Sequence, residues 1–212
     1  YNDKPVVNQL SIRIEQGEFF GLIGPNGAGK TTTIRMLTSL TGISSGSISI
    51  NGQEVSRKNT DFMSLIGLVP QSNNLEPELT VQENLKHHGL LYKMKSNDIK
   101  LKSRELIDFA DLTEKADSFV STLSGGMKRK LLIIRALMHN PDIILLDEPT
   151  VGLDVFARRK VWDLIKKLHF TGKTIILTTH YLDEAETLCT KIALINKGHL
   201  VLSESIERLR EM

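Results

Sequence analysis

Eight consecutive residues, 24–31, have the types and order needed to bind a nucleoside triphosphate. They read Gly-Pro-Asn-Gly-Ala-Gly-Lys-Thr, which fits the P-loop pattern of a glycine-rich turn that ends in Lys and Ser or Thr. The glycines permit positive φ angles and let backbone N–H groups approach phosphate oxygens closely. The pattern predicts that Lys30 contacts the β- and γ-phosphates and that the Thr31 hydroxyl coordinates Mg²⁺.

Two carboxylates follow an apolar segment, 143–146, that is predicted to be a buried strand. A charge is tolerated there only at the exposed strand end, where Asp147 would meet Mg²⁺ and Glu148 would polarise the attacking water. By themselves these residues could merely cap the turn at Pro149, but the P-loop makes the nucleotide role the better interpretation. A GTPase would need Asn-Lys-x-Asp or Thr-Lys-x-Asp to read the base, and residues 196–199 are Asn-Lys-Gly-His.

Between these two motifs, Ser124-Gly125-Gly126 is predicted to begin a helix that carries an apolar stripe. The free N–H groups and the positive end of a helix make its start an anion site. An ordinary N-cap accounts for the serine, but two glycines at a helix start cost helix propensity. We therefore expect a second phosphate contact at Ser124–Gly126.

Strands and helices alternate on both sides of a long helical stretch, which predicts a single α/β domain with a mainly parallel sheet. The core comprises residues 1–70 and 141–212, and an α-helical subdomain is inserted at about 71–140. Within the insertion, Thr80-Val81-Gln82-Glu83 is a capping box that begins a helix. Residues 47–50 alternate and end in Asn51-Gly52, a hairpin signal that predicts an antiparallel part near the N-terminus.

The composition excludes several classes of function. With 27 Lys and Arg against 25 Asp and Glu, the net charge of +2 gives no electrostatic footprint for nucleic acid. We interpret the basic run 128–130 as a solvated helix face. Cys189 is the single cysteine of the 212 residues, so no intrachain disulfide can form and a reducing, cytoplasmic location is expected. No apolar run reaches the length of about 18 residues that a membrane span requires, and no signal peptide is evident.

Taken together with Gln71, Asp154 and His180, these motifs resemble the ATP-binding subunit of an ABC transporter along the whole chain. The fold implied is a P-loop NTPase core with an N-terminal antiparallel β part and the inserted helical subdomain. The nucleotide-binding residues implied are Tyr1, Gly24, Pro25, Asn26, Gly27, Ala28, Gly29, Lys30, Thr31, Thr32, Ser124, Gly125, Gly126 and Asp154. The catalytic residues implied are Glu148, His180 and Gln71, and the ligands of Mg²⁺ are Thr31, Gln71 and Asp147.

The resemblance gives specific roles to four of these residues. Tyr1 would stack on adenine, and His180 would bond the γ-phosphate. Gln71 would reach Mg²⁺ and the attacking water while sensing the membrane partner. Asp154 would cross a dimer interface and also cap the helix that follows it.

The resemblance also implies partners. Two copies would enclose two ATP molecules head to tail, with Ser124–Gly126 of one copy on the nucleotide of the other. The pair would dock on separate transmembrane permease subunits at the cytoplasmic face of the membrane. Met127 stands where the family usually has Gln or Glu, and this variant resembles the drug and antibiotic exporters of the daunorubicin-resistance type.

Two alternatives stay open at this point, a soluble ABC ATPase of DNA repair or translation and a regulatory ATP-binding module. The first usually carries two cassettes or a long coiled-coil insertion, and Glu148 and His180 argue against a module without turnover. The family also has a strand before its adenine-stacking aromatic residue. We therefore expect this chain to begin inside its domain and to be cut at Met212.

Overall fold

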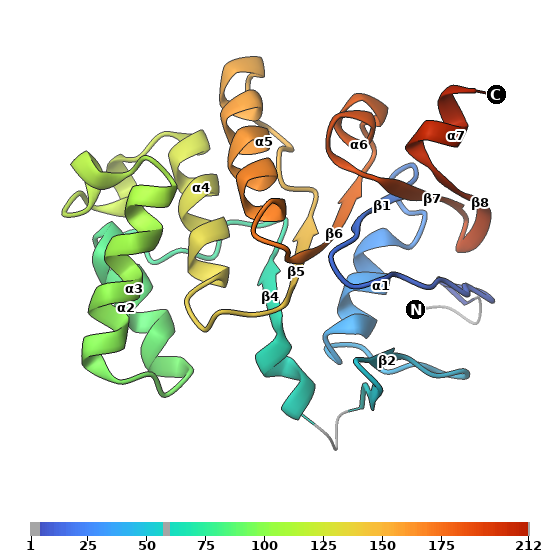
Figure 1. Ribbon diagram of the computed structural model, residues 1–212, viewed down its shortest axis with the longest axis horizontal. Helices are drawn as coiled ribbons and strands as arrows, with labels where there is room; N and C mark the ends of the chain where they lie inside the picture. Colours follow the sequence, from blue (N-terminus) through green and yellow to red (C-terminus); the bar gives the residue numbers. More distant parts are fainter. Residues whose placement is uncertain (1–4, 57–59, 212) are drawn as a thin grey trace.

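The computed structural model describes residues 5–56 and 60–211. In this part of the chain the main sheet has the strand order β4-β5-β6-β1-β7-β8 (Figure 1). Every neighbouring pair is parallel except β7 and β8. Its strands are β1 (Phe19–Ile23), β4 (Ile66–Val69), β5 (Ile143–Asp147), β6 (Thr174–Thr179), β7 (Lys191–Asn196) and β8 (His199–Ser205). The predicted mainly parallel α/β fold is confirmed.

The antiparallel part is a short hairpin, β2 (Ser49–Ile50) and β3 (Gln53–Glu54). Its turn residues have positive φ angles, 49° at Asn51 and 76° at Gly52. A type I′ turn requires this backbone at both central positions, which is why Asn-Gly predicts such hairpins. The hairpin expected at these residues is confirmed.

Helices α2, α4, α5 and α7 begin at residues whose side chains cap them. Thr80 Oγ1 accepts from the Glu83 N–H at 3.2 Å, and the Thr80 N–H donates to Glu83 Oε2 at 2.8 Å, which is the predicted capping box. The α-helices are α1 (Lys30–Leu37), α2 (Val81–Leu91), α3 (Ser96–Phe109), α4 (Gly125–Ala136), α5 (Val155–His169), α6 (Leu182–Leu188) and α7 (Ile206–Arg210). Over the described ranges, none of the helices combines the length and the apolar composition that crossing a membrane demands.

Apolar side chains cover the sheet on both faces. Along β1, Phe19 and Ile23 belong to one buried cluster, and Phe20 and Leu22 belong to the other. Helix α1 packs in the second cluster through Ile34, whereas α2, α3, α4 and α5 contribute to the first. Figure 1 shows α2, α3 and α4 grouped on one side of the molecule, with α5 next to α4. The helix after the P-loop and the helix that begins at Ser124 therefore lie on opposite faces of the sheet.

The basic run 128–130 differs from the expected solvated face. Arg129 and Lys130 are only 6% and 9% exposed. The ammonium group of Lys130 donates to the Ala110 carbonyl at 2.8 Å and lies 3.2 Å from Asp111 Oδ2, at the end of α3. Buried cations are tolerated where their donors find acceptors, and a local pattern does not show the acceptors that other elements supply. The interpretation as a solvated face is wrong for these two residues.

Candidate nucleotide-binding site

The P-loop connects the buried strand β1 to α1, and its tip at residues 25–27 is exposed. Gly27 and Gly29 have φ angles of 79° and 107°, as the pattern predicted. Gly24 is required for another reason, because a Cβ atom there would lie 2.3 Å from the Ile195 carbonyl oxygen. The expectation of a positive φ angle is therefore wrong at Gly24, where a neighbouring strand excludes any side chain.

Lys30 is the first residue of α1, and its side chain is buried inside the loop. Its ammonium group donates to the carbonyls of Gly24 at 2.8 Å and Pro25 at 3.1 Å. It also lies 3.1 Å from Glu148 Oε1, and both side chains of this pair are almost fully buried. A buried cation next to the exposed tip of the loop is suited to an anion that enters at that tip.

Asp147 ends β5 and is buried beside the P-loop. Its Oδ1 accepts from Thr31 Oγ1 at 3.2 Å and from Thr178 Oγ1 at 2.5 Å. Magnesium prefers oxygen ligands and binds through one or two carboxylates together with phosphate oxygens. The adjacent oxygens of Thr31 and Asp147 therefore fit the ion that the P-loop pattern implies.

Side chains from three other parts of the chain lie around the carboxylate of Glu148. The φ angle of Glu148 is 46°, uncommon for a residue with a side chain and recurrent at active sites. Its N–H donates to the Thr178 carbonyl at 3.0 Å, while its Oε2 accepts from Gln71 Nε2 at 3.1 Å. Nδ1 of His180 lies 3.4 Å from Glu148 Oε1 but makes no hydrogen bond to it. Residues 30, 71 and 180, far apart in the sequence, thus surround one carboxylate.

The remaining predicted residues lie elsewhere or form part of the loop. Ser124 is the N-cap of α4 and accepts from the Met127 N–H at 3.3 Å. Asp154 caps α5 by accepting from the Ala157 N–H at 2.9 Å. A Cβ atom on Gly126 would lie 3.0 Å from that of Ala157, so close packing of α4 on α5 itself favours glycine there. Thr32 lies in the first turn of α1, and the prediction for Tyr1 falls outside the described residues.

Sequence reasoning missed two residues that hold this site together. Thr178 reaches Asp147 because β5 and β6 are neighbours with these residues in register. Arg129 donates to backbone carbonyls on both sides of Glu148. The one local signal for Arg129 was a cation within an apolar helix, a pattern that indicates burial when the helix is covered on all sides.

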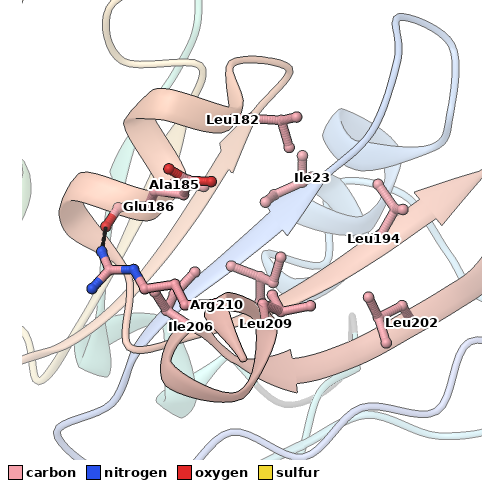
Figure 2. Close-up of a pocket in the computed structure, with 10 residues that line it drawn as sticks. Ile23, Leu182, Ala185, Glu186, Leu194, Leu202, Ile206, Leu209 and Arg210 are labelled. Carbon is pink, nitrogen blue, oxygen red and sulfur yellow. Dashed lines mark hydrogen bonds between the residues drawn. The ribbon is translucent and has the colours of Figure 1, made fainter. Parts of the chain in front are cut away.

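A separate cavity of about 280 Å³ is lined by none of these site residues (Figure 2). Figure 2 shows aliphatic side chains from β1, α6, β7, β8 and α7 around it, with Glu186 and Arg210 at its edge. Such a lining offers few partners for phosphate, so this cavity is not the candidate site.

Comparison with known proteins shows the family to which this chain belongs. Residues 7–151 match the family model described as ABC transporter. The Nod factor export ATP-binding protein I of Paraburkholderia xenovorans (strain LB400) is 45% identical over 201 residues, which are 95% of this chain and 66% of that protein. The protein of the same name from Rhizobium meliloti (strain 1021) is 46% identical, with 95% and 60% covered. This chain therefore spans less than two thirds of these relatives.

Solved structures agree with the sequence comparison. A dimeric post-hydrolysis state of an ATP-binding cassette bound to ADP and Pi has a TM-score of 0.83 at 30% identity, covering 95% of this chain and 90% of that one. The ATP binding subunit of an ABC transporter has a TM-score of 0.84 at 28% identity, covering 100% and 88%. The likeness extends over the sheet and the helical segment alike.

Proposed function

Since the chain belongs to the ABC transporter family and matches its ATP-binding domain, we propose that it hydrolyses ATP and drives export through separate membrane subunits. The observation that carries the proposal is Glu148, which contacts Lys30 and Gln71 and lies beside His180 at the P-loop. Export is proposed because the relatives at 45% identity are named for it. The antibiotic-exporter branch suggested by Met127 remains a prediction.

The proposed reaction is transfer of the γ-phosphoryl group to water. The triphosphate would compete with Glu148 for Lys30, because both are anions within reach of one ammonium group. Glu148 would then accept a proton from the attacking water while Gln71 and His180 orient it. Thr31, Asp147 and Gln71 would hold Mg²⁺, which neutralises phosphate charge when bound.

The working state proposed is a dimer of two copies, with Ser124–Gly126 of each copy on the nucleotide of the other. The two helices concerned, α1 and α4, pack on opposite faces of the sheet, so one chain presents its P-loop and its Ser124 end separately. Ser124 is also exposed. A structural neighbour that is dimeric with ADP and Pi supports a dimer as the working state. Asp154, at the adjacent start of α5, would lie in this interface.

The inserted segment, about residues 71–140, is proposed to be a subdomain that contacts the permease. It begins at Gln71, which bonds Glu148, and so connects the hydrolytic carboxylate with helices α2 and α3. A groove of about 560 Å³ lies along α3 and is lined in part by Tyr92, Met94 and Leu101. Leu101 is 70% exposed, and exposed apolar groups around a groove mark interaction surfaces. The protein would thus be peripheral on the cytoplasmic face of the membrane.

The permease contact can be tested by placing a photo-reactive amino acid at Leu101 in the cells that make this protein. We expect illumination to attach the chain to an integral membrane protein, identified by mass spectrometry. Phe170 is the control position, because it is apolar and 87% exposed but lies at the end of α5. A product with soluble proteins alone would favour a non-transport ABC ATPase instead.

The nucleotide site can be tested with Lys30→Ala. This change removes a charge-assisted partner that contributes on the order of 1.5–3 kcal/mol, so affinity for a non-hydrolysable ATP analogue should fall roughly ten- to a hundredfold. Isothermal titration measures this directly. Lys191→Ala is the matched control, because Lys191 pairs with Glu18 away from the P-loop. Unchanged affinity in Lys30→Ala would refute the P-loop assignment.

A further inference from the structure

Arg129 is a buried cation that the proposed mechanism leaves unused. It lies in the second turn of α4, and its guanidinium group donates to backbone carbonyls of two separate segments. In the first segment Nη1 donates to Pro70 at 2.7 Å. In the second, Nη2 donates to Glu148 at 2.6 Å and Nε donates to Pro149.

These two segments carry the residues assigned to hydrolysis. Pro70 precedes Gln71, whose carbonyl lies 3.5 Å from Nη1. The Glu148 carbonyl belongs to the residue with the φ angle of 46°. The Arg129 side chain therefore fixes the backbone at both Gln71 and Glu148, whose side chains are joined by a hydrogen bond.

The chemistry of arginine suits this task. Its planar group presents five donors in a fixed fork, whereas the ammonium group of lysine is a compact point charge without that planar arrangement of donors. Burial lowers the pKa of Arg129 to about 10, with Asp147 and Glu184 acting in the opposite direction, so it remains protonated at neutral pH.

A second buried group holds the same turn from the other side. Glu184 on α6 is fully buried, and its Oε1 accepts from Thr150 Oγ1 at 2.7 Å and from Trp162 Nε1 at 2.9 Å. Thr150 directly follows the proline that Arg129 bonds. The turn after Glu148 is therefore held between α4 and α6.

We infer that Arg129 is a positioning residue that links the Ser124 end of α4 to the hydrolytic residues Glu148 and Gln71 of the same chain. The inference rests on the proposed function. Ser124 and Arg129 are separated by roughly 7.5 Å along one rigid helix. In the proposed dimer the start of α4 faces the partner's nucleotide, while Glu148 faces the nucleotide of its own chain. Arg129 thereby connects the helix start that faces one nucleotide to the carboxylate that faces the other.

The first test compares Arg129→Gln with Lys130→Gln in the purified protein. Lys130 is the matched control, because it is a neighbouring buried cation on the same helix whose acceptors lie at the end of α3. Arg129→Gln should lower kcat roughly ten- to a hundredfold, the scale of misplacing a catalytic group, with KM and nucleotide affinity near wild type. Arg129→Lys should not restore kcat. Lys130→Gln should lower the melting temperature but keep kcat.

The second test asks whether Arg129 acts through Gln71. Combining Arg129→Gln with Gln71→Ala should cost less than the product of the two single effects, because residues that act as a unit are non-additive. Independent effects, or a fall in kcat that Lys130→Gln reproduces at equal stability, would overturn the inference and leave Arg129 merely structural.

Hydrogen exchange separates this inference from the proposed function. Arg129→Gln should speed exchange of the Glu148 amide, which now donates to Thr178, and Lys130→Gln should not. A wild-type protein without ATPase activity would refute the proposed function, and unchanged exchange at this amide in Arg129→Gln would refute the positioning role by itself.

Discussion

The Glu148→Gln protein is expected to bind MgATP while hydrolysing it at least about ten- to a hundredfold more slowly than wild type, the scale for removing a general base. The amide has nearly the shape of the carboxylate but cannot accept a proton from water. It also removes the negative charge that Lys30 now balances, so repulsion with the phosphates falls and the ATP-bound dimer should be strengthened. Single-turnover hydrolysis and isothermal titration measure the two parts separately.

A matched control for this variant is Glu18→Gln. Glu18 is also a largely buried carboxylate beside a lysine, Lys191, but it lies away from the P-loop. The Glu18→Gln protein should keep wild-type turnover. Near-normal hydrolysis by Glu148→Gln would remove Glu148 from the mechanism.

The second large effect is expected from Ser124→Arg, which should abolish ATP-driven dimerisation and turnover while monomers still bind ATP. The exposed serine caps α4, and a long side chain there would occupy the space proposed for the partner's γ-phosphate. Losing the cap costs about 1 kcal/mol of stability, so a control variant must show the effect of losing a helix cap by itself. Ser205→Arg does this, because Ser205 caps α7 in the same way. Loss of ATP binding by isolated Ser124→Arg monomers would contradict the assignment.

Much of the fold could be predicted because its signals are local. The P-loop glycines, the apolar run before Asp147 and the Thr80 capping box each act over fewer than about ten residues, within the reach of backbone and cap chemistry. The strand and helix positions that they imply agree with those observed.

The features that could not be predicted from the sequence depend on contacts between segments that are far apart in the chain. The bond from Thr178 to Asp147 exists because β6 lies next to β5, and Gly24 is required because the Ile195 carbonyl of β7 lies against it. Arg129 was misread for the same reason, since its acceptors lie 20 and 59 residues away. Strand order and helix docking supply these contacts, and a single sequence does not encode them as a local pattern.

The most direct test of the account mixes two variants that each lack half of the composite site. Ser124→Arg keeps an intact P-loop, and Lys30→Ala keeps an intact Ser124 helix start; Glu148→Gln in both prevents hydrolysis. Sedimentation velocity with MgATP should show monomers for each protein alone and a dimer after mixing, with one ATP bound per pair of chains. If the mixture stays monomeric while Glu148→Gln by itself dimerises with ATP, Ser124 does not act on the partner's nucleotide and the head-to-tail arrangement is wrong.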